Sequence, residues 1–329
     1  MKLEILHDDP LAVLGSTRSV VENAKFVFID ERQLNELAQA VAARFKGGFA
    51  AAEMGFRSVG DLEQDAQLIF LEDTVNFSFW VGKNELKWRV GLPDGAATQG
   101  GWFALVACFE RALAARRPIL EAAYLADISP ADGRDFFCGL DGVEIPLLDE
   151  RLNNFRESGR VLLERFDGRF VNAVEEAHFD APTAAKLIVE NFSSFRDVSK
   201  WDGTDVCFYK RAQICAYDLG YVFRTAGKTV VRTEGLTAFA DYKVPQILRL
   251  FGVLRYEKEL ADRIDNYFEL PHDSREEIEI RAASIWAVEL LRQRAPQLTA
   301  VEIDNTLWLM SQDIQAASQP YHRTRTIFY

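Results

Sequence analysis

Residues 299–312, TAVEIDNTLWLMSQ, combine an acidic residue with the pattern of a helix that buries one face. The apolar residues recur at three- and four-residue steps, which is typical of an amphipathic helix. Thr299 and Glu302 have the spacing of a capping box, so this helix is predicted to begin at Thr299. Asp304 and Trp308 lie one turn apart at the edge of the apolar face. A carboxylate partly desolvated beside an indole can stabilise a developing positive charge. The alternative is a solvated acid at the margin of a packing helix.

The rest of the chain is predicted to be mainly α-helical, so helices must position this acid. Helical spacing of apolar residues recurs in several further segments, and some of them begin with a capping residue or a proline. The expected helices are two within 16–45 that break near residues 29–30, one each over 103–116, 149–166, 180–192, 206–223 and 276–294, and two short ones within 236–254.

One region has strand spacing instead. Over residues 75–90 the apolar side chains alternate with polar ones on both sides of a Gly-Lys-Asn turn signal at 82–84. This pattern predicts a small antiparallel β-hairpin in the N-terminal half. Asn76 and Ser78 on one of its faces either line a pocket or face solvent. We expect an N-terminal unit over 1–145 and a helical unit over 146–329, with one continuous domain as the alternative.

Charge and composition restrict the class of protein. The chain has 329 residues, of which 48% are hydrophobic and 27% charged, an ordinary balance for a globular protein. No apolar run is long enough to span a membrane, and acidic residues occupy the place of a signal-peptide core, so a cytoplasmic protein is expected. The net charge of -12 disfavours long nucleic acids, which bind basic surfaces, but a single nucleotide remains possible.

Cysteines and histidines are few, and they are widely spaced. Neither set has the spacing of zinc ligands, and no C-x-x-C occurs, so we expect no metal and a reducing compartment. The four cysteines and four histidines are Cys108, Cys138, Cys207, Cys215, His7, His178, His272 and His322.

Seven blocks, in this order, resemble the queuosine salvage family. They are NFSFW (76–80), SSFRD (193–197), FYKRAQI (208–214), FADYKVPQIL (239–248), SREEIEIRAASIWAVELLR (274–292), DNTLW (304–308) and YHRTRTIFY (321–329). The resemblance runs from about residue 16 to the last residue, and Met54 stands where a histidine would be expected. It implies an enzyme that hydrolyses the N-glycosidic bond of queuosine 5'-phosphate and releases the base queuine for reinsertion into transfer RNA.

The family's C-terminal half is similar to helix-hairpin-helix DNA glycosylases, in which an Asp near the start of a late helix serves the glycosidic carbon. The resemblance implies that role for Asp304. Cleavage of the bond places positive charge on the ribose, which a carboxylate can stabilise or attack. Asp304 is therefore expected to be ionised, and the positive end of its helix would favour this if it lies in the first turn. The alternative is a capping or solvated side chain.

Asp241 and Phe239 are the candidates for holding the base. A guanine-like edge, which 7-deazaguanine retains, presents adjacent N–H donors that one carboxylate can accept. Phe239 could stack on the base, a contact worth ~1–3 kcal/mol. The alternative is a turn-forming Asp ahead of Pro245 and a core Phe, since Asp and Pro both favour turns.

Further candidates lie beside these acids or in two basic clusters. Asn305 could bind a ribose hydroxyl or face water, and Trp308 could wall the pocket or belong to the core. A 5'-phosphate needs one or two cations, and ion pairing with the excess acids is the alternative for each. The clusters contain Lys210 and Arg211, and His322, Arg323 and Arg325.

The sequence thus predicts a helical N-glycosidase without metal or redox cofactor, acting on a small nucleotide. Two alternatives remain. One is a non-catalytic protein that binds a modified nucleoside or transfer RNA. The other is a DNA repair glycosylase, which the acidic net charge disfavours because base flipping needs a basic duplex-binding face. The oligomeric state is left open.

Overall fold

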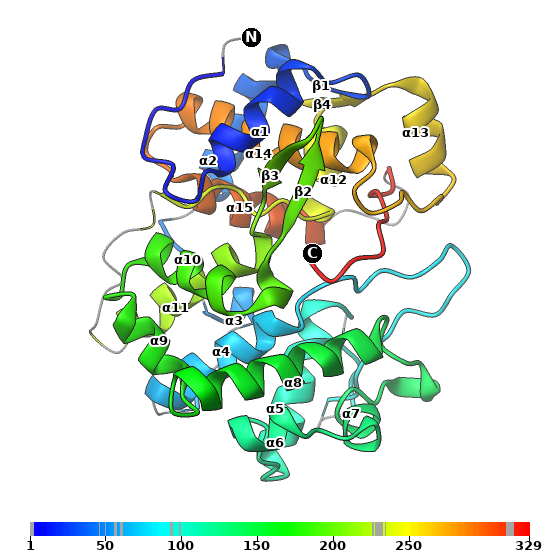
Figure 1. Cartoon of the computed structure of the whole chain (residues 1–329). Coiled ribbons are helices and arrows are strands. Elements are labelled where there is room, and N and C mark those ends of the chain that lie inside the picture. Colours follow the sequence, from blue (N-terminus) through cyan, green and yellow to red (C-terminus); the bar gives the residue numbers. More distant parts are fainter. Residues whose placement is uncertain are drawn as a thin grey trace.

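Helices dominate the chain and fall into two groups, drawn one above the other in Figure 1. The computed structural model describes residues 3–45, 47–49, 51–55, 58–59, 62–92, 95–98, 100–225, 227, 233, 235–313 and 319–329. The predicted mainly α-helical class is confirmed. Within these residues, no helix has both the length and the apolar character needed to cross a membrane.

The first group joins helices from both ends of the chain around α14 (Arg275–Arg294). This helix is buried along most of its length, and it contacts four other helices. They are α1 (Val13–Glu22), α2 (Leu34–Arg44), α12 (Lys243–Leu250) and α15 (Ala300–Gln312). The short α13 (Lys258–Asp265) lies at the edge of this group.

The second group comes from the middle of the chain. Its members are α4 (Leu62–Thr74), α5 (Trp102–Ala114), α6 (Ala122–Ala126), α7 (Pro130–Phe136), α8 (Leu148–Arg165), α9 (Phe170–Glu176), α10 (Ala181–Asn191) and α11 (Lys210–Thr225). α8 packs on α4 and α6, whereas α1 and α2 pack on α14. The second group thus contains helices from both sides of residue 145, and the division expected there, with one continuous domain as the alternative, stays a prediction.

Three helices begin where the sequence predicts, each with a side chain that accepts from a first-turn amide. Asp180 accepts from the Thr183 N–H at the start of α10, and Ser274 accepts from the Glu277 N–H at the start of α14. At α15 the full capping box forms, since the Thr299 side chain accepts from the Glu302 N–H while Glu302 accepts from the Thr299 N–H. Local sequence thus orients the helix that carries Asp304.

The predicted hairpin over residues 75–90 is wrong. That segment is extended but pairs with no strand of its own. Its backbone is satisfied by other groups: the Arg151 guanidinium donates to the Val75 and Phe77 carbonyls, and the Ser78 N–H donates to the Tyr329 carbonyl at 2.8 Å. The alternation in the sequence does not produce a ladder, and it does not follow burial either: Ser78 and Trp80 are buried, whereas Leu86 is 70% exposed.

The strands lie elsewhere, in two antiparallel pairs. β1 (Val27–Ile29) pairs with β4 (Leu254–Tyr256), and β2 (Val198–Trp201) pairs with β3 (Thr204–Cys207). β3 thus replaces the start of the helix expected over 206–223, which begins only at Lys210. Likewise residues 236–242 are not helical, and only α12 of the two short helices forms.

Candidate active site

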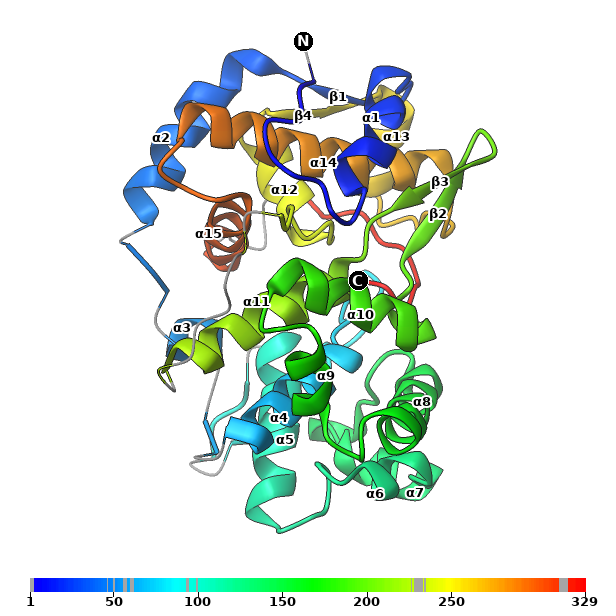
Figure 2. The same cartoon turned by 60° about the vertical axis from the view of Figure 1, so that its left-hand side comes forward.

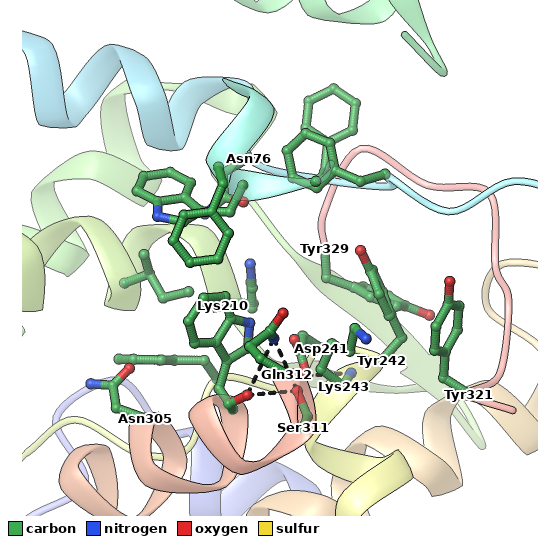
Figure 3. A pocket seen from close by; sticks show the side chains of 18 of the residues that line it. Asn76, Lys210, Asp241, Tyr242, Lys243, Asn305, Ser311, Gln312, Tyr321 and Tyr329 are labelled. Carbon is green, nitrogen blue, oxygen red and sulfur yellow. Dashed lines mark hydrogen bonds between the residues drawn. The ribbon is translucent and has the colours of Figure 1, made fainter. Parts of the chain in front are cut away.

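A cavity of about 280 Å³ lies between the two groups of helices. Its wall receives side chains from α11, α12 and α15, from the extended segment after α4, and from the C-terminal tail (Figure 3). Six predicted site residues line it, namely Lys210, Phe239, Asp241, Asp304, Asn305 and Trp308. Met54 and Asn76 line it too, whereas Ser78 is buried and donates to the Thr326 carbonyl.

Asp304 projects from α15 and is only 3% exposed. Its Oδ1 accepts from the Phe239 N–H at 2.9 Å. Burial raises the pKa of Asp304 well above its usual range, and the nearby Asp241 carboxylate adds to the rise, while this hydrogen bond and Lys210 oppose it. Asp304 is the fifth residue of α15, beyond the first turn. The helix N-terminus therefore does not supply the expected stabilisation of its charge, because that effect fades within one turn.

Asp241 precedes α12 and is 8% exposed. Its Oδ1 accepts from the backbone N–H groups of Lys243 and Val244, both at 2.8 Å. Burial raises the pKa of Asp241, while Lys210 and these two N–H groups act in the opposite direction. Asp241 thus orders the turn, as the structural alternative proposed, and it also lines the cavity. The two predicted acids, far apart in sequence, meet around one space.

Lys210 lies in the first turn of α11 and is buried. Its positive charge lowers the pKa of both Asp241 and Asp304. Burial lowers the pKa of Lys210, and Asp241, then Asp73, and more weakly Asp304 oppose that shift. Within the described residues its ammonium forms no ion pair. The positive charge of Lys210 therefore partly compensates the negative charge of these acids in the cavity wall. Its neighbour Arg211 is structural, since its guanidinium donates to the carbonyls of Asp73, Thr74 and Ser194.

The aromatic and amide candidates also reach the cavity. Phe239 is buried on its wall, with its ring centroid 6.2 Å from that of Tyr217. Trp308 packs near Phe103 at a centroid distance of 6.0 Å, so it serves both cavity and packing. The Asn305 Nδ2 is buried without a hydrogen-bond partner, so this amide keeps a free donor.

His322 and Arg323 do not line the cavity. His322 is buried, and burial lowers its pKa to about 3, with Arg281 and Arg323 contributing, so the imidazole is neutral near pH 7. The Arg323 guanidinium packs over the ring of Tyr321 and donates to its carbonyl. The sequence showed that these residues are basic but not where their side chains point. Neither is placed to bind a phosphate in the cavity.

Two other lysines line the cavity, and they were not selected from the sequence. Lys243 has its Nζ 5.1 Å from the centre of the Tyr321 ring, and the charge of Lys87 lowers the pKa of Lys243, behind the effects of burial and Asp241. Figure 3 shows Lys243 beside Tyr242 and Tyr321, away from Asn305. Lys243 belongs to the FADYK block, so its position in the block was the available signal.

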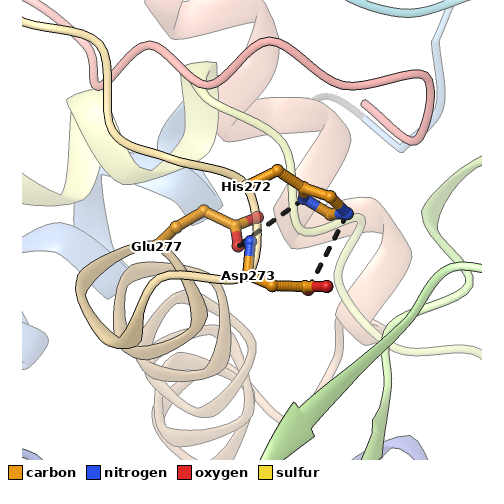
Figure 4. Close-up of side chains that lie close together, drawn as sticks. All are labelled: His272, Asp273 and Glu277. Carbon is orange, nitrogen blue, oxygen red and sulfur yellow. Dashed lines mark hydrogen bonds and ion pairs between the residues drawn. The ribbon is translucent and has the colours of Figure 1, made fainter.

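One group among the described residues has the spacing of metal ligands, at His272, Asp273 and Glu277 (Figure 4). The Glu277 carboxylate already accepts from the Tyr329 O–H at 2.9 Å and from the Asp273 N–H at 3.1 Å. It also lies 3.6 Å from the Arg281 guanidinium. Because its charge is compensated and its oxygens are engaged, this group is explained by packing at the start of α14.

Comparison with known proteins identifies one family. The family model described as queuosine salvage protein matches residues 57–329. The chain belongs to the queuosine salvage protein family. A relative from Sphaerobacter thermophilus, named queuosine 5'-phosphate N-glycosylase/hydrolase, is 44% identical over 326 residues, 98% of each chain. Proteins of the same name from Bos taurus and Mus musculus are 33% and 35% identical over at least 97% of this chain.

Several blocks by which the queuosine salvage family was recognised meet at the cavity. Asn76, Lys210, Asp241 and Asp304 come from four of them, and Tyr329 from the last. The blocks are distant in sequence, yet each contributes a side chain to the same wall. The family pattern therefore coincides with the cavity as well as with the helix core.

Proposed function

We propose that this chain hydrolyses the N-glycosidic bond of queuosine 5'-phosphate to queuine and ribose 5-phosphate. Family membership and the names of its relatives support this substrate. The observation that carries the proposal is the meeting of Asp241 and Asp304, with Lys210 beside them, in one cavity. A nucleotide there is held by its base and its sugar at once.

The reaction breaks the bond between the ribose C1' and the base nitrogen, and the bonding electrons leave with the base. Positive charge then develops on the ribose ring, where a nearby carboxylate stabilises or attacks it. Water supplies a hydroxyl group to C1' and a proton to the departing base. The chain must therefore provide one anion beneath the sugar and hydrogen bonds that fix the base.

The sequence assigned the sugar to Asp304 and the base to Asp241, and the hydrogen bonds favour the opposite arrangement. Asp241 accepts from two backbone N–H groups at the start of α12, whereas Asp304 accepts from one. A carboxylate held this way keeps its negative charge more readily. Asp241 also lies two residues before the start of α12, close to the expected position of the acid in the glycosylase-like pattern. We infer that Asp241 faces the sugar and Asp304 the base edge.

The 5'-phosphate is assigned to Lys243 and Lys87. Both line the cavity, and each lacks an ion pair within the described chain. Lys210 is less suited, because its charge is already directed at Asp241, Asp73 and Asp304. A dianionic phosphate between two lysines would relieve their mutual repulsion.

Release of free base from queuosine 5'-phosphate, measured by chromatography, tests the proposal. Asp241→Asn should lower kcat by about 10²–10³, whereas Asp304→Asn should mainly raise KM. The reverse pattern returns Asp304 to the sugar and Asp241 to the base. No release by the unaltered chain, with base binding retained, favours a binding protein; base excision from duplex DNA favours the repair alternative.

A further inference from the structure

The wall formed by α11 contains a second acid that the proposed reaction does not use. Lys210, Ile214 and Asp218 line the cavity at four-residue steps, so they form one stripe along the helix. With a rise of about 1.5 Å per residue, the Cα atoms of Lys210 and Asp218 lie about 12 Å apart along the axis. The cavity thus extends along α11 beyond the region of Asp241 and Asp304.

Asp218 is 5% exposed, and no hydrogen bond or ion pair joins its side chain to another described residue. Acids surround it: Asp73 and Glu72 raise its pKa, after burial, while Lys210 alone opposes them. The Asp73 Oδ2 is also buried without a partner. The cavity wall here therefore presents the unpartnered Asp218 carboxyl group, with two further buried acids behind it.

A buried, unpartnered carboxyl group is costly to the fold. A ligand cation would remove that cost, because it would neutralise the charge and supply the missing donors. A neutral ligand or water would supply donors but would not stabilise the ionised form of the acid. The stripe on α11 therefore points to a cationic group on whatever occupies the cavity.

The substrate named for the relatives has such a group. Queuine is a 7-deazaguanine that carries an aminomethyl-cyclopentenediol arm, and its secondary amine is protonated near neutral pH. The arm leaves the five-membered ring, across the base from the edge that carries the N–H donors. If that edge is held near Lys210 by Asp304, the arm extends away from it along the wall.

We propose that Asp218 binds the protonated amine of this arm and thereby selects queuine over guanine-type bases that lack it. The inference rests on the proposed function. It also explains the distribution of charge in the cavity. Besides burial, the charges that shift the pKa of Lys243 are those of Asp241, Lys87 and Arg323. Those that shift the pKa of Asp218 are Asp73, Glu72 and Lys210. The anionic phosphate and the cationic arm of the substrate thus have separate partners of opposite charge.

The test compares two substrates, queuosine 5'-phosphate and 7-deazaguanosine 5'-phosphate, which lacks the arm. The unaltered chain should prefer the first in kcat/KM. Asp218→Asn should raise KM for queuosine 5'-phosphate roughly 10–100-fold, as expected for loss of a charged hydrogen bond. Its kcat/KM for the substrate without the arm should change less than about 3-fold.

Asp73→Asn is the matched control, since Asp73 is a buried acid beside Asp218 that does not line the cavity. It should retain the preference for the arm. An Asp218→Asn protein with the same substrate preference as the unaltered chain overturns the proposal. If the unaltered chain hydrolyses neither substrate, the proposed function fails. That outcome is distinct from an Asp218→Asn protein that hydrolyses both substrates with unchanged preference, which contradicts only the role of Asp218.

A measurement without any variant guards against misfolding of Asp218→Asn. Calorimetry on the unaltered chain should show queuine binding at least about 10-fold more tightly than 7-methyl-7-deazaguanine, whose arm is neutral and short. Equal affinities for the two bases would overturn the role of Asp218, whatever the variant does.

Discussion

Two groups of buried acids behave differently in this molecule. Asp197 is 1% exposed, and both its oxygens accept from the Arg281 guanidinium at 2.8 and 2.6 Å. Asp241 and Asp304 are almost as buried, yet within the described residues neither forms an ion pair with a lysine or arginine. Similar burial thus coexists with complete compensation in the core and incomplete compensation in the cavity.

The difference separates structural charge from charge available to a ligand. The Arg281–Asp197 pair joins α14 to the segment before β2, and the Arg281 Nε also donates to the Ala240 carbonyl. Its hydrogen-bonding capacity is used within the protein. The cavity acids keep free oxygens, and burial raises their pKa values because their few hydrogen bonds do not offset it. Such perturbed acids are a mark of functional sites.

Breaking the structural pair should have the largest effect. Arg281→Met is expected to lower the free energy of unfolding by about 3–5 kcal/mol, because the Asp197 carboxylate remains buried without its partner. Urea unfolding followed by circular dichroism measures this loss. Arg325→Met is the control, since the Arg325 ion pair with Glu269 is exposed and should contribute about 0–1 kcal/mol. Equal losses for the two variants would mean that the buried Arg281–Asp197 pair stabilises the fold no more than an exposed ion pair does.

Substitution of a buried acid near the cavity should instead stabilise the fold at neutral pH. Burial raises the pKa of Asp73 to about 7, so the native state favours its protonated form. For such a group, stability falls as pH rises from the unfolded pKa of about 4 to the native value of about 7. Asp73→Asn removes that cost, which is on the order of a few kcal/mol, at the expense of the bond from Asn76. Its stability relative to the unaltered chain should therefore increase between pH 4 and pH 8.

Thermal unfolding at several pH values measures this trend. A gap between Asp73→Asn and the unaltered chain that stays constant from pH 4 to pH 8 would show that Asp73 is compensated in the fold. The contrast with Asp197 would then be lost at this position.

Helix patterns predicted more of this fold than strand patterns did. The starts of α10, α14 and α15 follow from capping residues that act within one turn of sequence. The alternation over 75–90 predicts a strand pairing that does not form. What satisfies that backbone, namely Arg151 and the C-terminal residue Tyr329, is distant in sequence and invisible to a local pattern.

The site was predicted in part for the same reason. Acids were found through short blocks, and both line the cavity. His322 belongs to a basic cluster in the sequence, but its side chain is buried in the fold, and burial lowers its pKa so that the imidazole is neutral near pH 7. Asp218 was missed although its spacing from Lys210 places both on one helix face, because the acids near it become neighbours only in the fold.

The lysines at the cavity should have a smaller, selective effect. Lys243→Met with Lys87→Met is expected to raise KM for queuosine 5'-phosphate roughly 10–100-fold and to leave KM for the nucleoside queuosine nearly unchanged. The reason is that only the phosphate gains from these two cations. Steady-state kinetics on both substrates measures the split. A matching rise for nucleoside and nucleotide would place the lysines near another part of the substrate.

The smallest effect should follow loss of the cap on α15. Thr299→Ala removes the side chain that accepts from the Glu302 N–H, at a cost of about 1 kcal/mol in unfolding free energy. Because Asp304 is also fixed by the Phe239 N–H, kcat/KM should fall less than about 3-fold. Thr299→Ser restores the acceptor and should restore stability. A large loss of kcat/KM in Thr299→Ala, with stability retained, would mean that the position of Asp304 depends on the helix start more than on the hydrogen bond from the Phe239 N–H. Asp304 would then be positioned by the start of its helix, whereas Asp197 is held directly by Arg281.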